Sequence, residues 1–316
     1  MKKLLSMLLA GAMLVSSTAM AFAESTGAAE KGTIIYGSST EIGGDFAPSS
    51  WWTNNATDKL IRDLTNDYGI TVTNQGGEFV VNDTVCKDLT SVVNDDGSKT
   101  FTVTINEGLT YNNGEAITAK DYVWGIVFSC SKVAMDTGAK LTGYLTYVGG
   151  QEYFDGKATA VSGVRLIDDY TYSVTIVASK IPYFYDLFYV GDIPLSIKYW
   201  LGDAVEVKDD GEGCYIAGDF TKEGIEKQLE YARFNAGEDR VSAGPYNLVA
   251  FDKGSLQATL TINPNYAGNF EGQKPSIEKI VVTKTEDATW ADALKTGAFN
   301  FYDTVTDGTQ IMTALD

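Results

Sequence analysis

The side chains able to do chemistry in this sequence are carboxylates, thiols and aromatic rings, because the chain contains no histidine. Histidine is the commonest general base and zinc ligand, so its absence removes Ser/His and Cys/His catalytic pairs and most zinc sites. Acid pairs occur at residues 95–96, 168–169 and 209–210, each beside turn residues. A glycosidase needs two acids facing each other across a cleft. We interpret these pairs as solvated turns, so the sequence favours a protein that is not an enzyme.

The three cysteines do not form a recognisable motif. Cys86, Cys130 and Cys214 are odd in number and widely spaced, so at most one disulfide could join them. We expect them to be reduced, semi-buried residues that behave as small apolar side chains. The sequence also lacks a phosphate-binding glycine loop and an EF-hand loop. We therefore expect neither a cofactor nor a metal.

Charge and length narrow the class of protein. The 316 residues carry 24 Lys and Arg against 42 Asp and Glu, a formal charge of −18. Such a field repels a phosphate backbone, which argues against nucleic-acid binding. The length suffices for two domains, and the 44% hydrophobic content can supply a sizeable core.

The first 23 residues have the pattern of a secretory signal peptide. Lys2 and Lys3 precede an apolar run over 4–15, and residues 21–23 form an Ala-x-Ala cleavage site. The run is too short for a membrane span, which needs about 20 residues. We expect an exported protein in the periplasmic space or at the extracellular cell surface. The sequence has no cysteine near the cleavage site to which a lipid anchor could be attached.

The elements that must position these side chains alternate between strands and helices. A helix is expected over residues 55–64, and Thr118 and Asp121 have the spacing of a helix capping box. Asp96-Gly97 predicts a hairpin turn. This interleaving predicts an α/β protein with mixed sheets. The expected strands cover residues 33–37, 69–73, 78–82, 100–105, 161–169, 170–177, 256–262 and 279–284, and a further helix covers 288–296.

Aromatic residues gather in three clusters. Trp51 and Trp52 stand in a polar loop, where two indoles form either an exposed binding surface or a pair packed beneath a lid. Tyr144, Tyr147, Tyr153 and Phe154 form a second cluster. The third consists of Tyr183, Phe184, Tyr185, Phe188 and Tyr189, and we interpret it as core packing.

One segment carries a specific family pattern. Residues 99–123 read as a strand, a turn of the form G-x-x-(F/W/Y)-x-(D/N)-G and a helix start of the form T-A-x-D-(V/Y/F). This pattern resembles the extracellular solute-binding proteins of ABC importers, family 5, the oligopeptide, dipeptide and nickel class. The matching positions are Gly108, Tyr111, Asn113, Gly114, Thr118, Ala119, Asp121 and Tyr122.

Four further segments agree with this family in the same order. Residues 164–187 are similar to its oligopeptide-binding branch, and residues 243–246 resemble its G-x-G-P-Y turn, with Ser242 in place of the first glycine. Residues 260–284 look like a strand that returns before the second lobe. Residues 293–300 resemble A-L-x-x-G-x-x-D, with Asn300 replacing the aspartate.

The resemblance implies a type II periplasmic-binding-protein fold with two lobes and mixed sheets. It implies a signal peptide over 1–23, a first lobe over 24–275 with a smaller subdomain at about 50–165, and the start of a second lobe over 276–316. Members of the family are considerably longer, so we expect the sequence to be truncated, with the second lobe incomplete.

The resemblance also implies the function of a substrate-binding component. Such a protein captures peptides outside the membrane and delivers them to an ABC permease, and we expect it to act as a monomer. The alternatives are another solute of the same family, such as a dipeptide, metal chelate or sugar, and a secreted glycosidase. Matching by position and composition, the candidate ligand-binding residues are Glu41, Ile42, Gly43, Trp51, Trp52, Tyr144, Tyr147, Ser242, Ala243 and Gly244.

Overall fold

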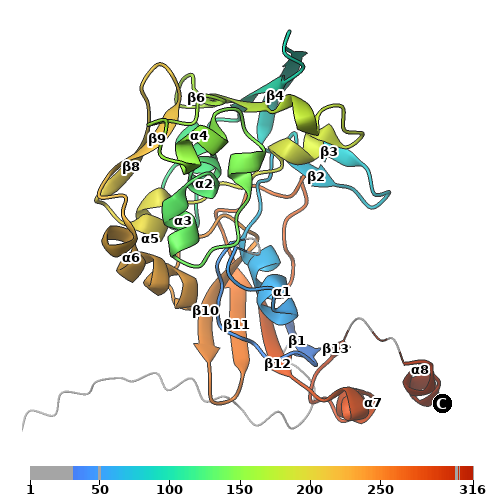
Figure 1. Ribbon diagram of the computed structural model, residues 1–316. Coiled ribbons are helices and arrows are strands. Elements are labelled where there is room, and N and C mark those ends of the chain that lie inside the picture. Colours follow the sequence, from blue (N-terminus) through green and yellow to red (C-terminus); the bar gives the residue numbers. More distant parts are fainter. Residues whose placement is uncertain (1–30, 49–50, 303–304, 306, 316) are drawn as a thin grey trace, which may run out of the picture.

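The computed structural model describes residues 31–48, 51–302, 305 and 307–315. The predicted signal peptide lies outside these residues. Within them the chain forms an upper part built around the strands β4 to β9 and a lower part that contains β1 and the last strands (Figure 1).

The lower part is a five-stranded mixed sheet in the order β10-β11-β12-β1-β13. Strand β1 (Thr33–Ser38) lies parallel to β12 (Lys279–Lys284) on one side and to β13 (Phe301–Tyr302) on the other. Strands β10 (Tyr246–Asp252) and β11 (Gln257–Ile262) extend it as an antiparallel hairpin. The prediction of mixed sheets is therefore confirmed.

Helix α1 (Ala56–Thr65) follows β1 and packs against β10. Asn55 caps it by accepting hydrogen bonds from the amides of Thr57 and Asp58, at 2.9 and 3.0 Å. The predicted helix is confirmed, but its fully buried face is largely polar. Asp58 and Arg62 are buried beside Ile61, whereas two leucines of the helix are only half-buried.

The upper part contains a four-stranded antiparallel sheet in the order β4-β5-β7-β6. The strands are β4 (Cys86–Val93), β5 (Lys99–Ile105), β6 (Val164–Leu166) and β7 (Thr171–Ile176). The predicted hairpin joins β4 to β5, and Gly97 adopts the positive φ of 83° that its turn requires.

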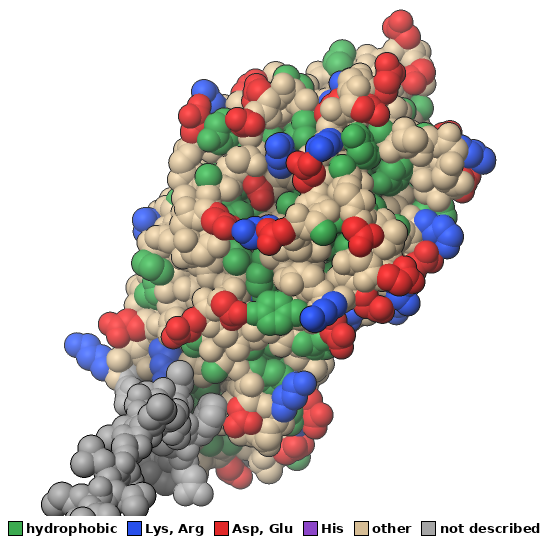
Figure 2. Space-filling model, turned by 90° about the vertical axis from the view of Figure 1, so that its left-hand side faces the viewer, with side chains coloured by type: hydrophobic (Ala, Val, Ile, Leu, Met, Phe, Trp, Pro, Cys, Tyr) green, Lys and Arg blue, Asp and Glu red, His purple; other side chains and the backbone are tan. Residues whose placement is uncertain are grey.

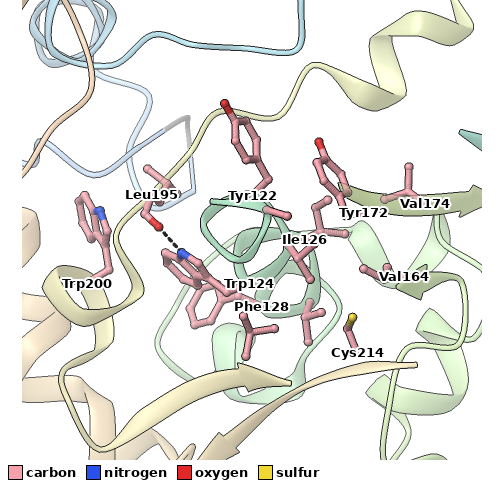
Figure 3. Close-up of a cluster of buried hydrophobic side chains, with 14 of the residues drawn as sticks. Tyr122, Trp124, Ile126, Phe128, Val164, Tyr172, Val174, Leu195, Trp200 and Cys214 are labelled. Atoms are coloured by element: carbon pink, nitrogen blue, oxygen red, sulfur yellow. Dashed lines mark hydrogen bonds between the residues drawn. The ribbon is translucent and has the colours of Figure 1, made fainter. Parts of the chain in front are cut away.

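Helix α2 (Ala119–Ser129) is the central helix of the upper part. The predicted capping box forms: Asp121 accepts hydrogen bonds from the Thr118 amide at 2.7 Å and from its hydroxyl at 2.9 Å. The helix is buried nearly all round, as expected for a helix without a polar face. Figure 3 shows Tyr122, Trp124, Ile126 and Phe128 of this helix among the buried side chains.

Shorter elements complete the fold. Two hairpins pair β2 (Thr71–Thr73) with β3 (Phe79–Val81), and β8 (Val205–Asp209) with β9 (Cys214–Gly218). The remaining helices are α3 (Lys132–Asp136), α4 (Gly150–Phe154), α5 (Ile197–Leu201), α6 (Lys222–Phe234), α7 (Trp290–Lys295) and α8 (Gly308–Leu315), and short 3-10 turns include η3 (Asp186–Val190) and η4 (Asp287–Thr289). Figure 2 shows acidic and basic side chains interspersed over one face.

Two hydrophobic cores correspond to the two parts. The larger one surrounds α2 and draws residues from Ala47 to Tyr266, and the smaller one lies between α1 and the lower sheet. Cys86, Cys130 and Cys214 are unpaired, as expected, but they are fully buried and not semi-buried. Burial raises the pKa of Cys86 to about 11 and that of Cys130 to about 12.

The third aromatic cluster was predicted wrongly for four of its five rings, whereas Tyr189 is partly buried and packs against the larger core. Tyr183, Phe184, Tyr185 and Phe188 are all exposed, with 89% of the Phe184 surface accessible. These rings lie in a loop and in η3, and they contact one another and Phe79 instead of entering the core. An aromatic-rich run in an irregular segment lacks the fixed periodicity that would direct one face inward.

The predicted lobe boundary at residue 275 does not coincide with a break in the sheet. Strand β12 pairs with both β1 and β11, and β13 pairs with β1, so both share the sheet of the first strand. The larger core likewise continues past residue 165. The division into lobes stays a prediction. Within the described part of the chain, the helices are all too short or too polar to cross a bilayer.

Candidate functional site

The three parallel strands end at one cavity. In α/β sheets, ligands bind outside the carboxyl ends of strands, where neighbouring connections run to opposite sides. Strand β1 has β12 on one side and β13 on the other, and the residues that follow all three strands line a cavity of about 800 Å³. We call this cavity the strand-end cleft. It is lined by Tyr36, Gly37, Ser38, Ser39, Thr40, Ala56, Thr57, Lys59, Leu60, Asp63, Asp287, Trp290, Tyr302, Val305, Asp307 and Gln310.

One wall joins the end of β1 to the first turns of α1. The hydroxyls of Ser38 and Thr57 are 2.7 Å apart, and the Thr57 hydroxyl donates to the Thr40 carbonyl at 2.8 Å. The Ser38 carbonyl accepts from the Thr285 amide at 2.8 Å, which ties the end of β1 to the end of β12. This wall is therefore fixed by hydrogen bonds, and the accessible hydroxyl residues that line the cleft beside it are Ser39 and Thr40.

The opposite wall is aromatic and acidic. The Trp290 indole stacks on the Tyr302 ring with centroids 5.4 Å apart and planes 3° apart. The Tyr302 hydroxyl donates to Asp287 at 2.5 Å, and the Trp290 indole N–H donates to Gln310. These contacts join η4, α7, β13 and α8 into one surface.

Carboxylates outnumber cations around the cleft. Asp63, Asp287 and Asp307 line it, whereas Lys59 is the one basic side chain among the lining residues and pairs with Asp63. Hydroxyls, aromatic rings and an acidic balance suit a neutral or cationic ligand that can form hydrogen bonds. Among the described residues, no group of three or more acidic or cysteine side chains is placed to hold a metal ion.

The predicted loop Glu41, Ile42 and Gly43 lies beside this cleft without lining it. Its backbone is fastened to α1, because Asp58 accepts from the amides of Gly43 and Gly44 at 2.8 and 3.1 Å. Ile42 is buried in the smaller core, whereas Glu41 and Gly43 are exposed. Burial raises the pKa of Asp58, although the loop amides oppose this shift.

The predicted turn Ser242, Ala243 and Gly244 is buried and committed to internal contacts. Ser242 exchanges hydrogen bonds with Asn112 at 3.0 Å, and the Gly244 amide donates to the Thr65 carbonyl at 2.9 Å. A Cβ on Gly244 would lie 2.3 Å from the Thr65 carbonyl carbon. The glycine is therefore required for close backbone packing, which also explains the turn motif.

The tryptophan pair packs beneath other elements instead of standing free. Trp51 stacks on Phe128 with a centroid distance of 5.4 Å, and Trp52 lies under the Arg233 guanidinium at 4.6 Å. Both rings remain partly accessible. Trp51 lines a second, smaller cavity with Tyr122 and Leu195, and Figure 3 shows the last two beside Trp124.

The two predicted tyrosines differ in how deeply they are buried. Tyr147 is buried in the larger core, which raises the pKa of its hydroxyl well above the usual value. Tyr144 is half-buried and stacks on Phe154 with a centroid distance of 4.3 Å. The structure therefore does not bring the predicted residues into one surface, and their role in binding stays a prediction.

Comparisons with known proteins address the family. Residues 87–314 match the sequence profile described as bacterial extracellular solute-binding proteins, family 5 Middle. The chain belongs to this family. The match covers more than half of the family-5 chain and includes the capped helix α2. None of the curated proteins compared with the sequence matches it.

Solved structures share the fold of the family-5 chain. The oligopeptide-binding protein AppA from Bacillus subtilis, in complex with a nonapeptide, superposes with a TM-score of 0.58 at 16% identity, over 89% of this chain and 45% of that one. Lactococcal OppA, complexed with an endogenous peptide in the closed conformation, gives 0.63 at 17% identity, over 89% and 46%. The periplasmic EDTA-binding protein EppA gives 0.63 at 13% identity, over 90% and 45%. The chain thus spans a little under half the length of these proteins.

Sequence reasoning missed the residues that line the strand-end cleft. Asp287 and Trp290 follow the predicted strand 279–284, and Tyr302 ends a two-residue strand that no pattern signalled. The usable signal was positional: polar residues directly after a buried parallel strand mark its carboxyl end. That signal needs the strand order, which the sequence did not give.

Proposed function

We propose that the family-5 chain forms part of the substrate-binding component of an ABC importer, which captures peptides outside the membrane and delivers them to a permease. The single observation that carries this proposal is the strand-end cleft, where three parallel strands of a solute-binding fold end at one cavity. Family membership supports export and transport as its setting.

Several features of the cleft support a peptide as the ligand. A peptide offers main-chain hydrogen bonds, and the wall at β1 includes the accessible hydroxyl residues Ser39 and Thr40. The Trp290 and Tyr302 rings provide an apolar surface, and the carboxylates around them disfavour a polyanionic solute. Two of the similar structures are described with bound peptides.

The proposal includes no catalysis, and the protein acts on its own as a monomer before it meets the permease. The candidate ligand contacts are the residues of the strand-end cleft, together with the neighbouring loop Glu41, Ile42 and Gly43. The predicted two-lobe organisation fits this proposal, because a cleft between lobes closes over its ligand.

Calorimetric titration with mixed tripeptides to pentapeptides tests the function. We expect saturable binding that Ala56→Trp weakens at least tenfold, because Ala56 is an exposed residue of the cleft wall and an indole would fill the cavity. Ala204→Trp changes an exposed residue outside the described cleft and should leave the affinity unchanged. Absence of binding to any peptide, combined with sugar hydrolysis by the purified protein, would reject the importer function in favour of a glycosidase.

A further inference from the structure

A second cavity lies between α1, α2 and the segment before α5. It has a volume of about 280 Å³, below the range of a typical drug-sized pocket, so it suits a single small group. We call it the helix cavity. Its lining residues are Trp51, Arg62, Asp63, Asn66, Tyr122, Gly125, Gly191, Asp192, Ile193 and Leu195.

Asp192 is a carboxylate without a counter-ion. It lines the helix cavity and keeps part of its surface accessible, yet protein surrounds it so closely that burial raises its pKa to about 7. None of the ion pairs found among the described residues includes it, and no basic group opposes the effect of burial on its pKa. An enclosed charge without a partner is costly, so a cation from outside would stabilise it.

The other charged groups of the cavity do not pair with Asp192. The Arg62 guanidinium donates through Nη1 to the Asp45 carbonyl at 3.3 Å and interacts electrostatically with Asp58, whereas its Nη2 is buried without a hydrogen-bond partner; burial lowers its pKa. Asp63 pairs with Lys59 at the exposed side of α1. Neither group neutralises Asp192. Tyr147 and Tyr172 interact electrostatically with Asp192, but their hydroxyls are uncharged.

The walls of the cavity suit the apolar part of a cationic ligand. The Trp51 indole is held by stacking on Phe128 and by an edge contact with Trp124 at 6.4 Å. Leu195 and Ile193 add aliphatic surface on the opposite element. A carboxylate beside an aromatic ring is a common arrangement for binding ammonium groups.

We propose that the helix cavity binds a primary alkylammonium group, with Asp192 as its counter-ion and the Trp51 side chain as its aromatic wall. This binding does not depend on the function proposed for the strand-end cleft. Asp63 lines both cavities, so the ammonium group comes either from a free amine or from a peptide that extends out of the cleft.

The test uses n-butylammonium as the probe, followed by ligand-observed NMR and calorimetry. We expect n-butylammonium to bind and the uncharged n-butanol to bind at least tenfold more weakly. Asp192→Asn should weaken n-butylammonium binding about tenfold or more, because a charge-assisted contact is lost. Asp203→Asn removes the same charge from an exposed site, where the side chain is 80% accessible, and should have no effect.

A second variant tests the location without changing any charge. A Cβ on Gly125 would meet Leu195 and Trp51 at an ordinary 3.8 Å, so Gly125→Leu should fill the cavity and abolish binding. Equal affinity of the wild type and Asp192→Asn, or retained binding in a folded Gly125→Leu protein, would overturn the proposal.

Two peptide probes separate the sources of the ammonium group. The one ammonium group of tetra-alanine is its amino terminus. The one ammonium group of acetylated Ala-Ala-Lys-Ala amide is on its lysine side chain. Sensitivity of either peptide to Asp192→Asn identifies that source, and sensitivity of n-butylammonium alone identifies a free amine. If peptides bind to the protein, but Asp192→Asn leaves the affinities of n-butylammonium and of both peptides unchanged, the helix-cavity proposal fails while the importer function stands.

Discussion

Individual carboxylates that protein surrounds closely differ in how well they are paired. Asp45 lies 2.7 Å from the Arg233 guanidinium, whereas Asp192 has no basic partner and its pKa is raised by burial to about 7, from an ordinary value of 3.8. A carboxyl group with a raised pKa holds its proton in the folded state at a pH where the unfolded chain has released it. Folding is therefore less favourable as the pH rises from about 4 to about 7.

The pH dependence of stability should respond to Asp192→Asn. At pH 8 the variant should be more stable than the wild type by about 2 kcal/mol, because it lacks the unpaired buried charge, and the difference should vanish near pH 4. Urea unfolding at both pH values measures this. Arg62 and Asp63 share the cavity and are unchanged in the comparison. A constant difference between pH 4 and pH 8 would contradict the explanation, and Asp203→Asn supplies the control for net charge.

At the scale of elements, the short strand β13 depends on one side chain. The side-chain oxygen of Asn300 accepts a hydrogen bond from the Ile35 backbone amide at 2.7 Å. The backbone amide of Asn300 donates to the Ile35 carbonyl at 3.0 Å. These bonds place β13 beside β1 and so position Tyr302 in the wall of the strand-end cleft. Aspartate, the residue of the family pattern, would supply the same acceptor.

The effect of a substitution at Asn300 on stability should therefore depend on whether the new side chain keeps the acceptor oxygen, and not on the side-chain NH₂ group. Asn300→Ala should lower the free energy of unfolding by about 1 kcal/mol, the usual contribution of one hydrogen bond, and should weaken peptide binding. Asn300→Asp should stay within about 0.5 kcal/mol of the wild type. Chemical denaturation and the peptide titration measure both effects. Equal losses in the two variants would show that the acceptor is not what holds β13.

At the scale of the whole molecule, one buried arginine joins the two cores. Arg240 is 3% exposed and donates to the carbonyls of Ala232 and Asn235, at 2.9 and 2.7 Å, and to that of Phe46. Phe46 belongs to the smaller core, whereas Ala232 belongs to the larger one. The guanidinium therefore satisfies backbone groups from both parts at once.

Removal of this link should cost more than removal of a surface ion pair. Arg240→Ala should lower the free energy of unfolding by about 3 kcal/mol or more, because three carbonyls lose a charged donor in a buried site. Arg165 forms an ion pair with Asp209, and its side chain is 38% exposed. Arg165→Ala should lower the free energy of unfolding by about 1 kcal/mol. Denaturant unfolding followed by tryptophan fluorescence compares them. Similar losses would mean that Arg240 does not couple the cores.

The sequence by itself determined the local structure and the family. Period-2 alternation marked β5, the Thr118 and Asp121 spacing marked the start of α2, and Asp96-Gly97 marked a hairpin, because each depends on residues near one another in the chain. Five motifs in order indicated the solute-binding family that the profile match shows.

Only the tertiary structure decided which residues share a surface. The strand-end cleft joins residues 36–63 to residues 287–310, and the counter-ion deficit at Asp192 follows from what α1, α2 and the preceding segment leave around it. The exposed Tyr183, Phe184 and Tyr185 show the same limit, since hydrophobicity does not specify burial in an irregular loop. Strand order and packing across hundreds of residues are non-local, so no local pattern contains them.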